Sequence, residues 1–531
     1  MSGSRWYDKS LVLRDGVRLV SRIWLPNSDG PWPALLMRQP YGREIASTIT
    51  YSHPEWWATR GYMVIIQDVR GMGSSEGVFN GFSQEASDTS ETHEWVRSLK
   101  ECNGKLGLYG FSYQGFTQLT GELNSKPPDC LSPAMTGINI KDHWCSDGGA
   151  YWWHNNIAWG LQIAALKLKR ENKLLEWQKI RLALENKSYL SEGIDTLKKY
   201  DPNSFVLEWL KNLNDASPFE EFKPISTWIK QPMLIIGGLW DPHLKGALDL
   251  YKKSKEAGGS PEIIIGNATH LNWWEGSQES LLKFFDKHLK SDEEFNSKNF
   301  KDEKKIWNIS LNKWEEFDNK FHPEFIFGLK SNGTANIEVE DGSLTINSKG
   351  SGWFTIVNDP WRPTPSDGGH LGPNPGKFNR SIIDKRLDVG VFQTNSFEED
   401  QYLRGVPTLE IQVKSDQPNF DICLALSLVE EDNEKVNQFS TGFLRVKNSK
   451  ISEECIYQIT MQPTNICLIK DSKLRLSISA AAYPAIGVNP GFGEGNVGSP
   501  SANHRVITLS FSLDKTFMKM TPFFINNYFF G

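Results

Sequence analysis

The segment Lys105-Leu-Gly-Leu-Tyr-Gly-Phe-Ser-Tyr-Gln-Gly115 decides the fold that we expect for this chain. A short apolar strand over 105–109 leads into a glycine, Ser112 follows that glycine by two residues, and a helix is predicted over 114–124. This order is typical of the elbow that raises a nucleophilic serine above the edge of a parallel sheet. The usual spacing is G-x-S-x-G, whereas here the second glycine comes one residue later. A serine that only caps a helix would produce the same short string.

The segments around this elbow alternate between strands and helices. A hairpin is predicted over 10–25, with Asp15-Gly16 at its turn. Short apolar runs typical of strands buried on both faces are followed by stretches with helical periodicity. The predicted strands are 34–37, 62–67, 105–109, 232–237 and 262–265, and the predicted helices are 82–99, 114–124, 244–257 and 281–289. This alternation predicts a mostly parallel, doubly wound α/β sheet.

Two regions differ in composition from this α/β core. Residues 142–228 are rich in Leu, Lys, Glu and Trp, and their helical spacing over 157–168 and 174–184 indicates an inserted helical cap. Beyond a polar linker, short alternating runs broken by Gly, Pro and Asn indicate an all-β jelly roll or sandwich. These runs are 306–311, 344–347, 409–413, 421–428, 474–479 and 506–513. We therefore predict a core over 1–141 and 229–300, a cap over 142–228 and a C-terminal β domain over 301–531.

Two residues late in the chain are the partners that a serine nucleophile needs. A serine hydroxyl is weakly nucleophilic at neutral pH, so it requires a base that an acid orients. Asp241 and His270 each follow directly after a predicted strand. Because ligand sites form at the carboxyl ends of parallel strands, we expect Ser112, Asp241 and His270 to converge there as nucleophile, acid and base. Taken singly, Asp241 could be a helix cap and His270 a loop histidine. His243 is a rival base, but it follows the acid too closely to face it across the site.

The oxyanion that forms during attack on a carbonyl needs hydrogen-bond donors. The backbone N–H of Tyr113, directly after the nucleophile, is one donor by geometry. The phenol of Tyr41, which follows an early strand, is a candidate for the second, with ordinary packing as the alternative.

Composition excludes several classes of partner. A chain of 531 residues with 39% hydrophobic and 23% charged residues is ordinary for a protein of two or three globular domains. The net charge of −6 and the lack of basic runs give no footprint for nucleic acid. No apolar run approaches the roughly 18 to 20 residues of a membrane span, and the N-terminus has no signal-peptide pattern. The six cysteines are scattered without metal-ligand spacing. We therefore expect a cytoplasmic protein without a metal site.

Tryptophan is unusually frequent, with 20 residues. An aromatic-lined acyl pocket and a generous core are both consistent with this number. The residues that we consider for such a pocket are Trp144, Trp152, Trp153 and Trp240.

Five motifs occur in order along the chain. They are Arg38-Gln-Pro-Tyr41, Gln67-Asp-Val-Arg-Gly-Met-Gly-Ser-Ser-Glu-Gly77, Gly110-Phe-Ser-Tyr-Gln-Gly115, Trp240-Asp241 and Phe392-Gln-Thr…Glu398-Glu-Asp…Gly405. Over essentially the whole chain, the sequence resembles the family of cocaine esterase, glutaryl-cephalosporin acylases and X-prolyl dipeptidyl-peptidases, whose elbow is typically G-x-S-Y-x-G. The resemblance implies an α/β-hydrolase core with an inserted helical cap and a C-terminal jelly-roll domain. It also implies Tyr41 as the second oxyanion donor, and no cofactor.

Four charged residues in or near these motifs could have structural or substrate-binding roles. We interpret Asp68 and Arg70 as structural, in a buried Asp–Arg pairing that fixes loops near the site. In one branch of the family, the α-amino-acid ester hydrolases, acidic residues directly after the catalytic Asp hold the substrate's ammonium group. Pro242-His243 stands there in this chain. Asp142 and Asp147 could do that instead, with solvated surface or helix caps as the alternative.

The resulting prediction is a serine hydrolase that cleaves an ester or amide through an acyl-enzyme. X-prolyl dipeptidyl-peptidase activity is the alternative within the family. A carbohydrate-binding protein on an inactive hydrolase scaffold is the alternative from another class, and the intact Ser, Asp and His set argues against it. The expected partner is a small-molecule ester, amide or short peptide, without nucleic acid or membrane. Assembly into a homo-oligomer stays open.

Overall fold

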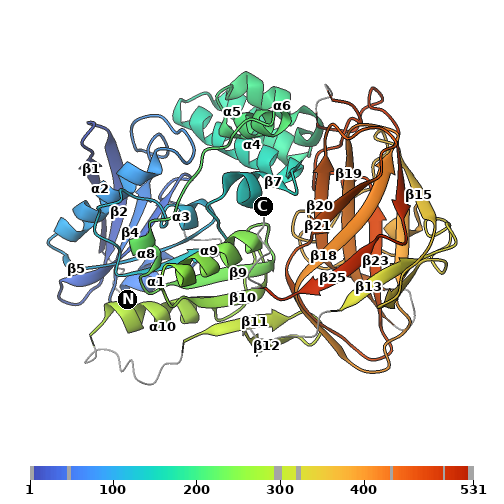
Figure 1. Ribbon diagram of the computed structural model, residues 1–531. Helices are drawn as coiled ribbons and strands as arrows, with labels where there is room; N and C mark the ends of the chain where they lie inside the picture. Colours follow the sequence, from blue (N-terminus) through green and yellow to red (C-terminus); the bar gives the residue numbers. More distant parts are fainter. Residues whose placement is uncertain are drawn as a thin grey trace.

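The computed structural model describes residues 5–44, 50–291, 302–317, 325–430, 435–493 and 497–523. Figure 1 shows an α/β core, a helical cap and an all-β domain, with the cap lying over the two others. None of the helices in these ranges has the length and apolar character that crossing a bilayer requires. The three predicted kinds of architecture are therefore all present.

The core is a ten-stranded sheet in the order β1-β2-β4-β3-β5-β6-β9-β10-β11-β12. Its strands are β1 (Arg5–Val12), β2 (Arg18–Leu25), β3 (Trp32–Gln39), β4 (Met63–Asp68), β5 (Cys102–Phe111), β6 (Cys130–Ala134), β9 (Leu234–Trp240), β10 (Glu262–Thr269), β11 (Lys304–Asn308) and β12 (Lys313–Glu316). Every pair from β4 to β11 is parallel, whereas β1, β2 and β12 pair antiparallel. The predicted doubly wound sheet and N-terminal hairpin are confirmed.

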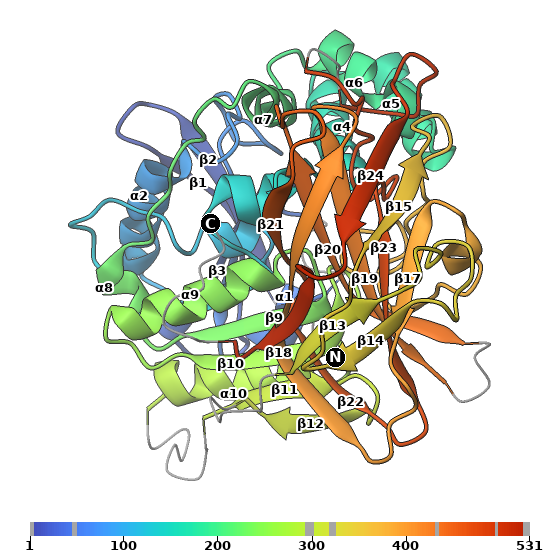
Figure 2. The ribbon, with the colours of Figure 1, turned by 45° about the vertical axis from the view of Figure 1, so that its right-hand side comes forward.

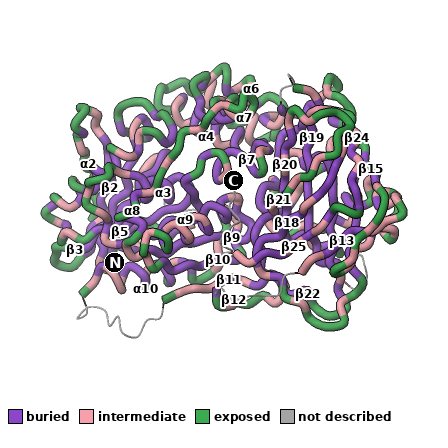
Figure 3. Tube along the Cα trace, viewed as in Figure 1, coloured by how far each residue is buried: buried purple, intermediate pink, exposed green. Residues whose placement is uncertain are grey.

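Helices cover both faces of this sheet, which explains the continuous apolar strands. Leu35 of β3 and Val64 of β4 belong to the cluster that packs with α1 and α10, while Leu36 and Ile65 belong to the cluster that includes α2 and α9. The bounds are α1 (Pro54–Ala58), α2 (Glu85–Ser98), α3 (Tyr113–Phe116), α9 (Leu244–Glu256) and α10 (Ser277–Leu289). Figure 3 shows these central strands as buried. Because both faces of the sheet are covered, these strands do not alternate between apolar and polar residues.

Three features of the core differ from the sequence prediction. Helix α3 has four residues, not the predicted eleven, because the Thr117 hydroxyl and the Gln118 amide bond the Gln114 carbonyl at 3.0 and 3.1 Å. Such side-chain bonds compete with continuation of a helix. Strand β6 contains Pro133 and lacked a recognisable pattern. Residues 304–316, which composition grouped with the β domain, extend the first sheet, since an alternating run does not reveal which sheet it joins.

The cap is inserted between β6 and β9 and shares a core with the elbow. Ile157 of α4, Leu197 of α6 and Val206 of α7 belong to one buried cluster with Phe116 of α3. A small hairpin precedes the helices and was not predicted. The elements are η1 (Lys141–Cys145), β7 (Ser146–Asp147), β8 (Ala150–Tyr151), α4 (Trp153–Arg170), α5 (Leu174–Glu185), α6 (Tyr189–Tyr200), α7 (Phe205–Asn214) and α8 (Ser226–Ile229).

The all-β domain is one thirteen-stranded sheet in the order β15-β24-β18-β25-β13-β14-β17-β23-β19-β20-β16, with β21 and β22 also pairing with β18. Figure 2 shows it curling beside the cap and the core. Its strands are β13 (Ile326–Lys330), β14 (Ser343–Ile346), β15 (Trp353–Asn358), β16 (Phe378–Asn379), β17 (Val389–Gln393), β18 (Gln401–Ser415), β19 (Phe420–Val429), β20 (Val436–Val446), β21 (Cys455–Thr460), β22 (Thr464–Leu468), β23 (Lys473–Ser479), β24 (Ile507–Ser512) and β25 (Phe517–Thr521); the short helix η3 (Ile383–Lys385) precedes β17. The domain docks on the cap, where Tyr483 and Ser499 donate hydrogen bonds to the Leu190 carbonyl.

Candidate active site

Ser112 lies between β5 and α3 in a strained backbone conformation. Its φ of 58° and ψ of −127° are unusual for a residue with a side chain, and such strain costs about 1–3 kcal/mol. The surrounding sheet holds it there, because the Ser112 N–H donates to the Ala134 carbonyl of β6 at 3.0 Å. Its hydroxyl bonds no other side chain among the described residues, and catalytic hydrogen bonds are often long in ligand-free sites. The conformation is that of a nucleophile elbow.

Two glycines allow the close crossing of strand and helix at this elbow. A Cβ on Gly110, whose φ is +143°, would lie 2.4 Å from the Cβ of Gln114. A Cβ on Gly115 would lie 2.8 Å from Thr136 and 3.0 Å from the Ala134 carbonyl. The side chain of Gln114 instead accepts a hydrogen bond from the Phe111 N–H at 3.2 Å. Gly115 therefore meets the steric requirement that the second glycine meets in the usual G-x-S-x-G motif.

The side chain of Tyr113 points away from the candidate site into a buried ionic network. Its hydroxyl lies 2.7 Å from Oε1 of Glu85, whose Oε2 pairs with Arg38 at 2.6 Å. The side chains of Arg38 and Glu85 are 2% and 0% exposed, and burial raises the pKa of Tyr113 well above its usual value. Among the described residues the backbone N–H of Tyr113 has no acceptor. This N–H is the free donor that an oxyanion hole requires.

Asp241 and His270 form a hydrogen-bonded pair at the ends of β9 and β10. Nδ1 of His270 lies 2.5 Å from Oδ2 of Asp241, and the other carboxylate oxygen accepts the His243 N–H at 2.8 Å. Asp241 is fully buried, whereas the His270 side chain is 28% exposed. Burial opposes ionisation of Asp241, yet its two histidine neighbours hold its pKa below the ordinary value. An ionised acceptor requires the His270 proton on Nδ1, which leaves Nε2 as the basic atom.

The acid–base pair lies beside the elbow. The ring of His270 is 5.2 Å from the ring of Phe111, the residue directly before Ser112. The ends of β5, β9 and β10 lie at the carboxyl edge of the same sheet, and the joint action of Ser112, Asp241 and His270 stays a prediction.

His243 does not occupy the position of a base. Its Nδ1 lies 2.7 Å from the His143 carbonyl, and burial lowers its pKa to about 4. Its ring lies 5.1 Å from His270 and 4.5 Å from Trp144. His243 is therefore a neutral side chain that lies next to the candidate base and lines the site.

Tyr41 follows β3 and packs in the aromatic cluster that contains Tyr113. Burial raises the pKa of Tyr41, so the phenol stays protonated and its O–H can donate a hydrogen bond. Trp159 of the cap is its neighbour in this cluster and was not singled out from the sequence.

A buried ion pair fixes the loop after Tyr41, although its partners differ from the predicted ones. Asp68 accepts hydrogen bonds from the Arg43 backbone N–H at 2.5 Å and from its guanidinium at 2.9 Å. Arg70, which the motif suggested as the partner, pairs with Asp88 at 2.7 Å. Asp68 is the last residue of β4, whereas Arg70 lies in the turn after it, so their closeness in the motif did not identify the pairing.

The four predicted pocket tryptophans separate into two pairs. Trp144 and Trp152 lie 4.5 and 5.6 Å from the His243 ring, close to the acid–base pair. Trp153 donates to the Leu190 carbonyl of α6, and Trp240 donates to Oδ1 of Asn267 at 2.6 Å. All four are buried. Only the first pair borders the site through described contacts.

Asp147 is neither solvated nor a helix cap, so that interpretation of it is wrong. The residue is 6% exposed, and its carboxylate lies 2.5 Å from Nζ of Lys245 and 3.1 Å from Nε2 of His370. Burial opposes its ionisation, but the two partners lower its pKa overall. The unpredicted β7–β8 hairpin turns this residue against α9 and the all-β domain. Asp142 is half-buried and accepts a hydrogen bond from Asn139 at 2.9 Å.

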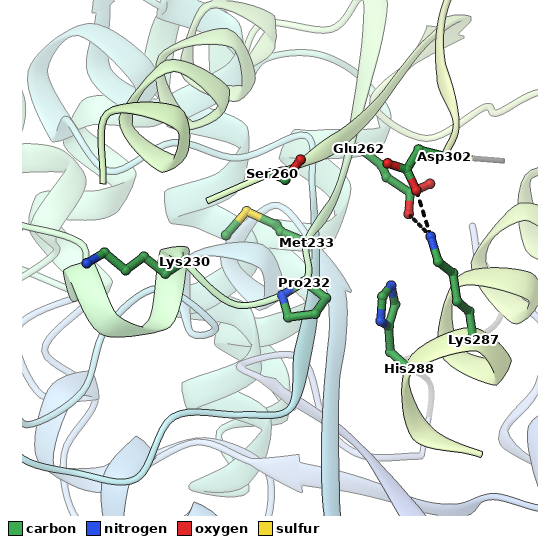
Figure 4. A pocket seen from close by; sticks show the side chains of 8 residues that line it. All are labelled: Lys230, Pro232, Met233, Ser260, Glu262, Lys287, His288 and Asp302. Atoms are coloured by element: carbon green, nitrogen blue, oxygen red, sulfur yellow. Dashed lines mark hydrogen bonds and ion pairs between the residues drawn. The ribbon is translucent and has the colours of Figure 1, made fainter. Parts of the chain in front are cut away.

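A cavity of about 240 Å³ lies at the opposite edge of the sheet, before β9 and β10 (Figure 4). Its Lys287 is paired with Glu262 at 3.3 Å and with Asp302 at 2.7 Å. Its charges are therefore largely neutralised within the wall, and it is remote from the elbow in the sheet.

Within the described ranges no group of three or more His, Cys, Asp or Glu side chains could hold a metal ion.

The chain is similar to known proteins over most of its length. Residues 15–272 match the X-Pro dipeptidyl-peptidase (S15 family), and residues 323–510 match the X-Pro dipeptidyl-peptidase C-terminal non-catalytic domain. Cocaine esterase of Rhodococcus sp. (strain MB1 Bresler) is 23% identical in an alignment 529 residues long, and the match covers 89% of this chain and 90% of the esterase.

Solved structures support the fold over the full length. An aminopeptidase from a marine sediment Thaumarchaeota archaeon has a TM-score of 0.72 at 17% identity, covering 98% of this chain and 97% of its own. A CocE/NonD family hydrolase from Staphylococcus aureus also has a TM-score of 0.72, at 16% identity, with 97% and 93% covered.

Fold and matches together define a serine hydrolase of the α/β-hydrolase class that acts on esters or amides. The chain belongs to the family of cocaine esterase and the X-prolyl dipeptidyl-peptidases, with an α/β-hydrolase domain followed by an all-β domain.

Proposed function

We propose that the protein hydrolyses an ester or amide through an acyl-enzyme on Ser112. The Ser112 hydroxyl attacks the substrate carbonyl while Nε2 of His270 takes its proton. His270 then protonates the leaving alcohol or amine, and a water activated by the same imidazole releases the acyl group. Asp241 orients the imidazole and stabilises its charged form. The observation that supports this assignment is the Asp241–His270 hydrogen bond beside the strained elbow.

The tetrahedral oxyanion would be held by two donors from different strands. One is the N–H of Tyr113 at the start of α3, which donates to no acceptor in the part of the chain that the structure describes, and the other is the protonated phenol of Tyr41 after β3. The Arg43–Asp68 pair would fix the Tyr41 loop, and the Glu85 network would fix α3. Donors held in advance stabilise the charge without reorganising at the moment of reaction.

Labelling by a fluorophosphonate probe tests the nucleophile. Ser112 should be modified in the wild type, since the probe forms a stable phosphonyl adduct with an activated serine. Labelling should disappear in Ser112→Ala and fall sharply in His270→Ala. A protein inert both to the probe and to p-nitrophenyl esters would contradict the proposal and favour a binding protein on a hydrolase scaffold.

The acyl side of the substrate is proposed to be uncharged and bulky. An aminopeptidase needs an anionic anchor for the substrate's ammonium group, and Asp147 was a candidate. That carboxylate is already paired with the Lys245 ammonium and hydrogen-bonded to His370, so it has little capacity for a substrate's ammonium group. Trp144, Trp152 and the neutral His243 beside the acid–base pair favour an apolar or aromatic group instead.

Dipeptidyl-peptidase activity is the second candidate, because both family matches carry that description. Turnover of Gly-Pro-nitroanilide and of its N-acylated form separates the two. Our proposal expects the free-amine substrate to have no advantage in kcat/KM, and activity on p-nitrophenyl esters to exceed both. A strong preference for the free amine would favour the peptidase.

The six cysteines are free in the structure. This is consistent with a reducing compartment, and we propose a cytoplasmic location on that basis. Separation of membrane and soluble fractions after native expression tests it. A homo-oligomer stays a prediction.

A further inference from the structure

We infer that Gln462, in the all-β domain, is a positioning residue that holds the main chain of Asp241 so that its carboxylate faces His270. The inference rests on the proposed function, since it assigns Asp241 as the acid of the site. It gives the C-terminal domain a direct part in the geometry of catalysis.

The contact joins the two domains at the end of β9. Nε2 of Gln462 lies 2.8 Å from the Asp241 carbonyl and 3.4 Å from the Leu239 carbonyl. Gln462 is 2% exposed, so water does not compete for these bonds. Because both neighbours are carbonyls, the NH₂ end of the amide must point toward them.

Gln462 itself is held rigidly. It lies between β21 and β22, and its backbone N–H donates to the Thr441 carbonyl at 2.8 Å. Its carbonyl accepts the Ser440 hydroxyl at 2.7 Å. Because hydrogen bonds fix the backbone of Gln462, its side chain holds the group that it bonds in a fixed position.

The same segment contacts the start of α9. The carbonyl of Thr460 lies 3.3 Å from Nζ of Lys245, which pairs with Asp147 of the cap hairpin. The acid loop from Asp241 to Lys245 is therefore bound to the all-β domain at both ends. Small displacements of this loop would change the direction of the Asp241 carboxylate.

The other end of the Gln462 amide has an energetic cost. Its Oε1 is buried and accepts no hydrogen bond from any described residue. A buried polar atom without a partner costs about 1–3 kcal/mol. A leucine of similar size would remove that cost but also the bonds to the Asp241 and Leu239 carbonyls, so it isolates what the amide NH₂ contributes at this contact.

The test compares Gln462→Leu with a matched control. Gln412 of β18 is also buried, and its amide bonds Glu454 within the same domain. Gln462→Leu should lower kcat for p-nitrophenyl esters by about tenfold to a hundredfold, as misplaced catalytic groups do. KM should change less than twofold, and the melting temperature should change no more than in Gln412→Leu, which should keep full kcat.

Two further measurements separate positioning from general packing. In an Asp241→Ala background, Gln462→Leu should cause no additional loss of kcat, because its effect passes through that carboxylate. The far-downfield proton resonance of the His270–Asp241 hydrogen bond should shift or disappear in Gln462→Leu and persist in Gln412→Leu. Additive losses in the double variant, or an unchanged resonance, would overturn the inference.

Failure of the proposed function gives a different pattern. If Ser112→Ala retains wild-type turnover, the nucleophile assignment is wrong, whereas the downfield resonance still reports whether Gln462 sets the Asp241–His270 geometry.

Discussion

Nδ1 of His270 and Oδ2 of Asp241 lie 2.5 Å apart, and this bond joins the ends of two neighbouring parallel strands. The pairing of β9 with β10 shifts register after Gly266, and Thr269 then pairs with Trp240. This irregularity brings the residues directly after both strands side by side. The acid and the base are therefore set by the sheet itself, while a separate strand, β5, presents the elbow.

Asp241→Asn should reduce kcat by about a thousandfold to ten-thousandfold. The amide can present its NH₂ to Nδ1 and so favour the wrong tautomer of His270, with the proton on the atom that should act as base. Steady-state turnover of a p-nitrophenyl ester measures the loss. Asp249→Asn, which removes only a partly exposed pair with Lys253 on α9, should remain fully active. Comparable activity in the two variants would remove Asp241 from the mechanism.

Tyr41→Phe should keep the fold and lose at least about a hundredfold in kcat, since one oxyanion donor contributes about 3 kcal/mol. The phenol is partly buried and protonated, and the variant removes only its oxygen. Turnover of an activated ester, with circular dichroism as the check on folding, tests it. Near-wild-type turnover would show that another group supplies the second donor.

Tyr113→Phe should have the opposite profile. Its hydroxyl lies 2.6 Å from the Gly81 carbonyl and 2.7 Å from Glu85, so its loss should destabilise the protein by about 1–3 kcal/mol. The backbone N–H is unchanged, so kcat well below the melting temperature should stay within a few-fold of wild type. Thermal unfolding and turnover are measured on the same sample. A large loss of kcat without loss of stability would mean that the phenol itself acts in the site.

Acid should destabilise the fold through buried neutral histidines. Burial lowers the pKa of His143 and of His243 to about 4, from an ordinary value of 6.5. Between pH 6.5 and 4 the unfolded chain binds protons that the folded one does not, so stability falls as the pH falls through this window. The melting temperature should therefore decline below about pH 6.5. His143→Gln should decline less steeply, and identical slopes would assign the effect to other groups.

Most of the fold prediction came from the periodicity of apolar residues and from the residues that directly follow predicted strands. Strands buried on both faces, the Asp15-Gly16 turn and the elbow around Ser112 are local or nearest-neighbour patterns, and the structure places them as expected. The end of α3 was misjudged because side chains of residues 117 and 118, rather than a glycine or proline, terminate it.

The sequence alone determined which residue types stand at the carboxyl ends of β5, β9 and β10, since the order of strands and the chemistry of a serine nucleophile restrict the choice. Only the tertiary structure decided what those residues contact. Asp147 pairs with Lys245 and His370, Asp68 pairs with Arg43, and Gln462 bonds the Asp241 carbonyl across a domain boundary. The physical reason is that a buried polar group must find its partner in space, and a partner up to 223 residues away in the chain leaves no periodic signal in the sequence.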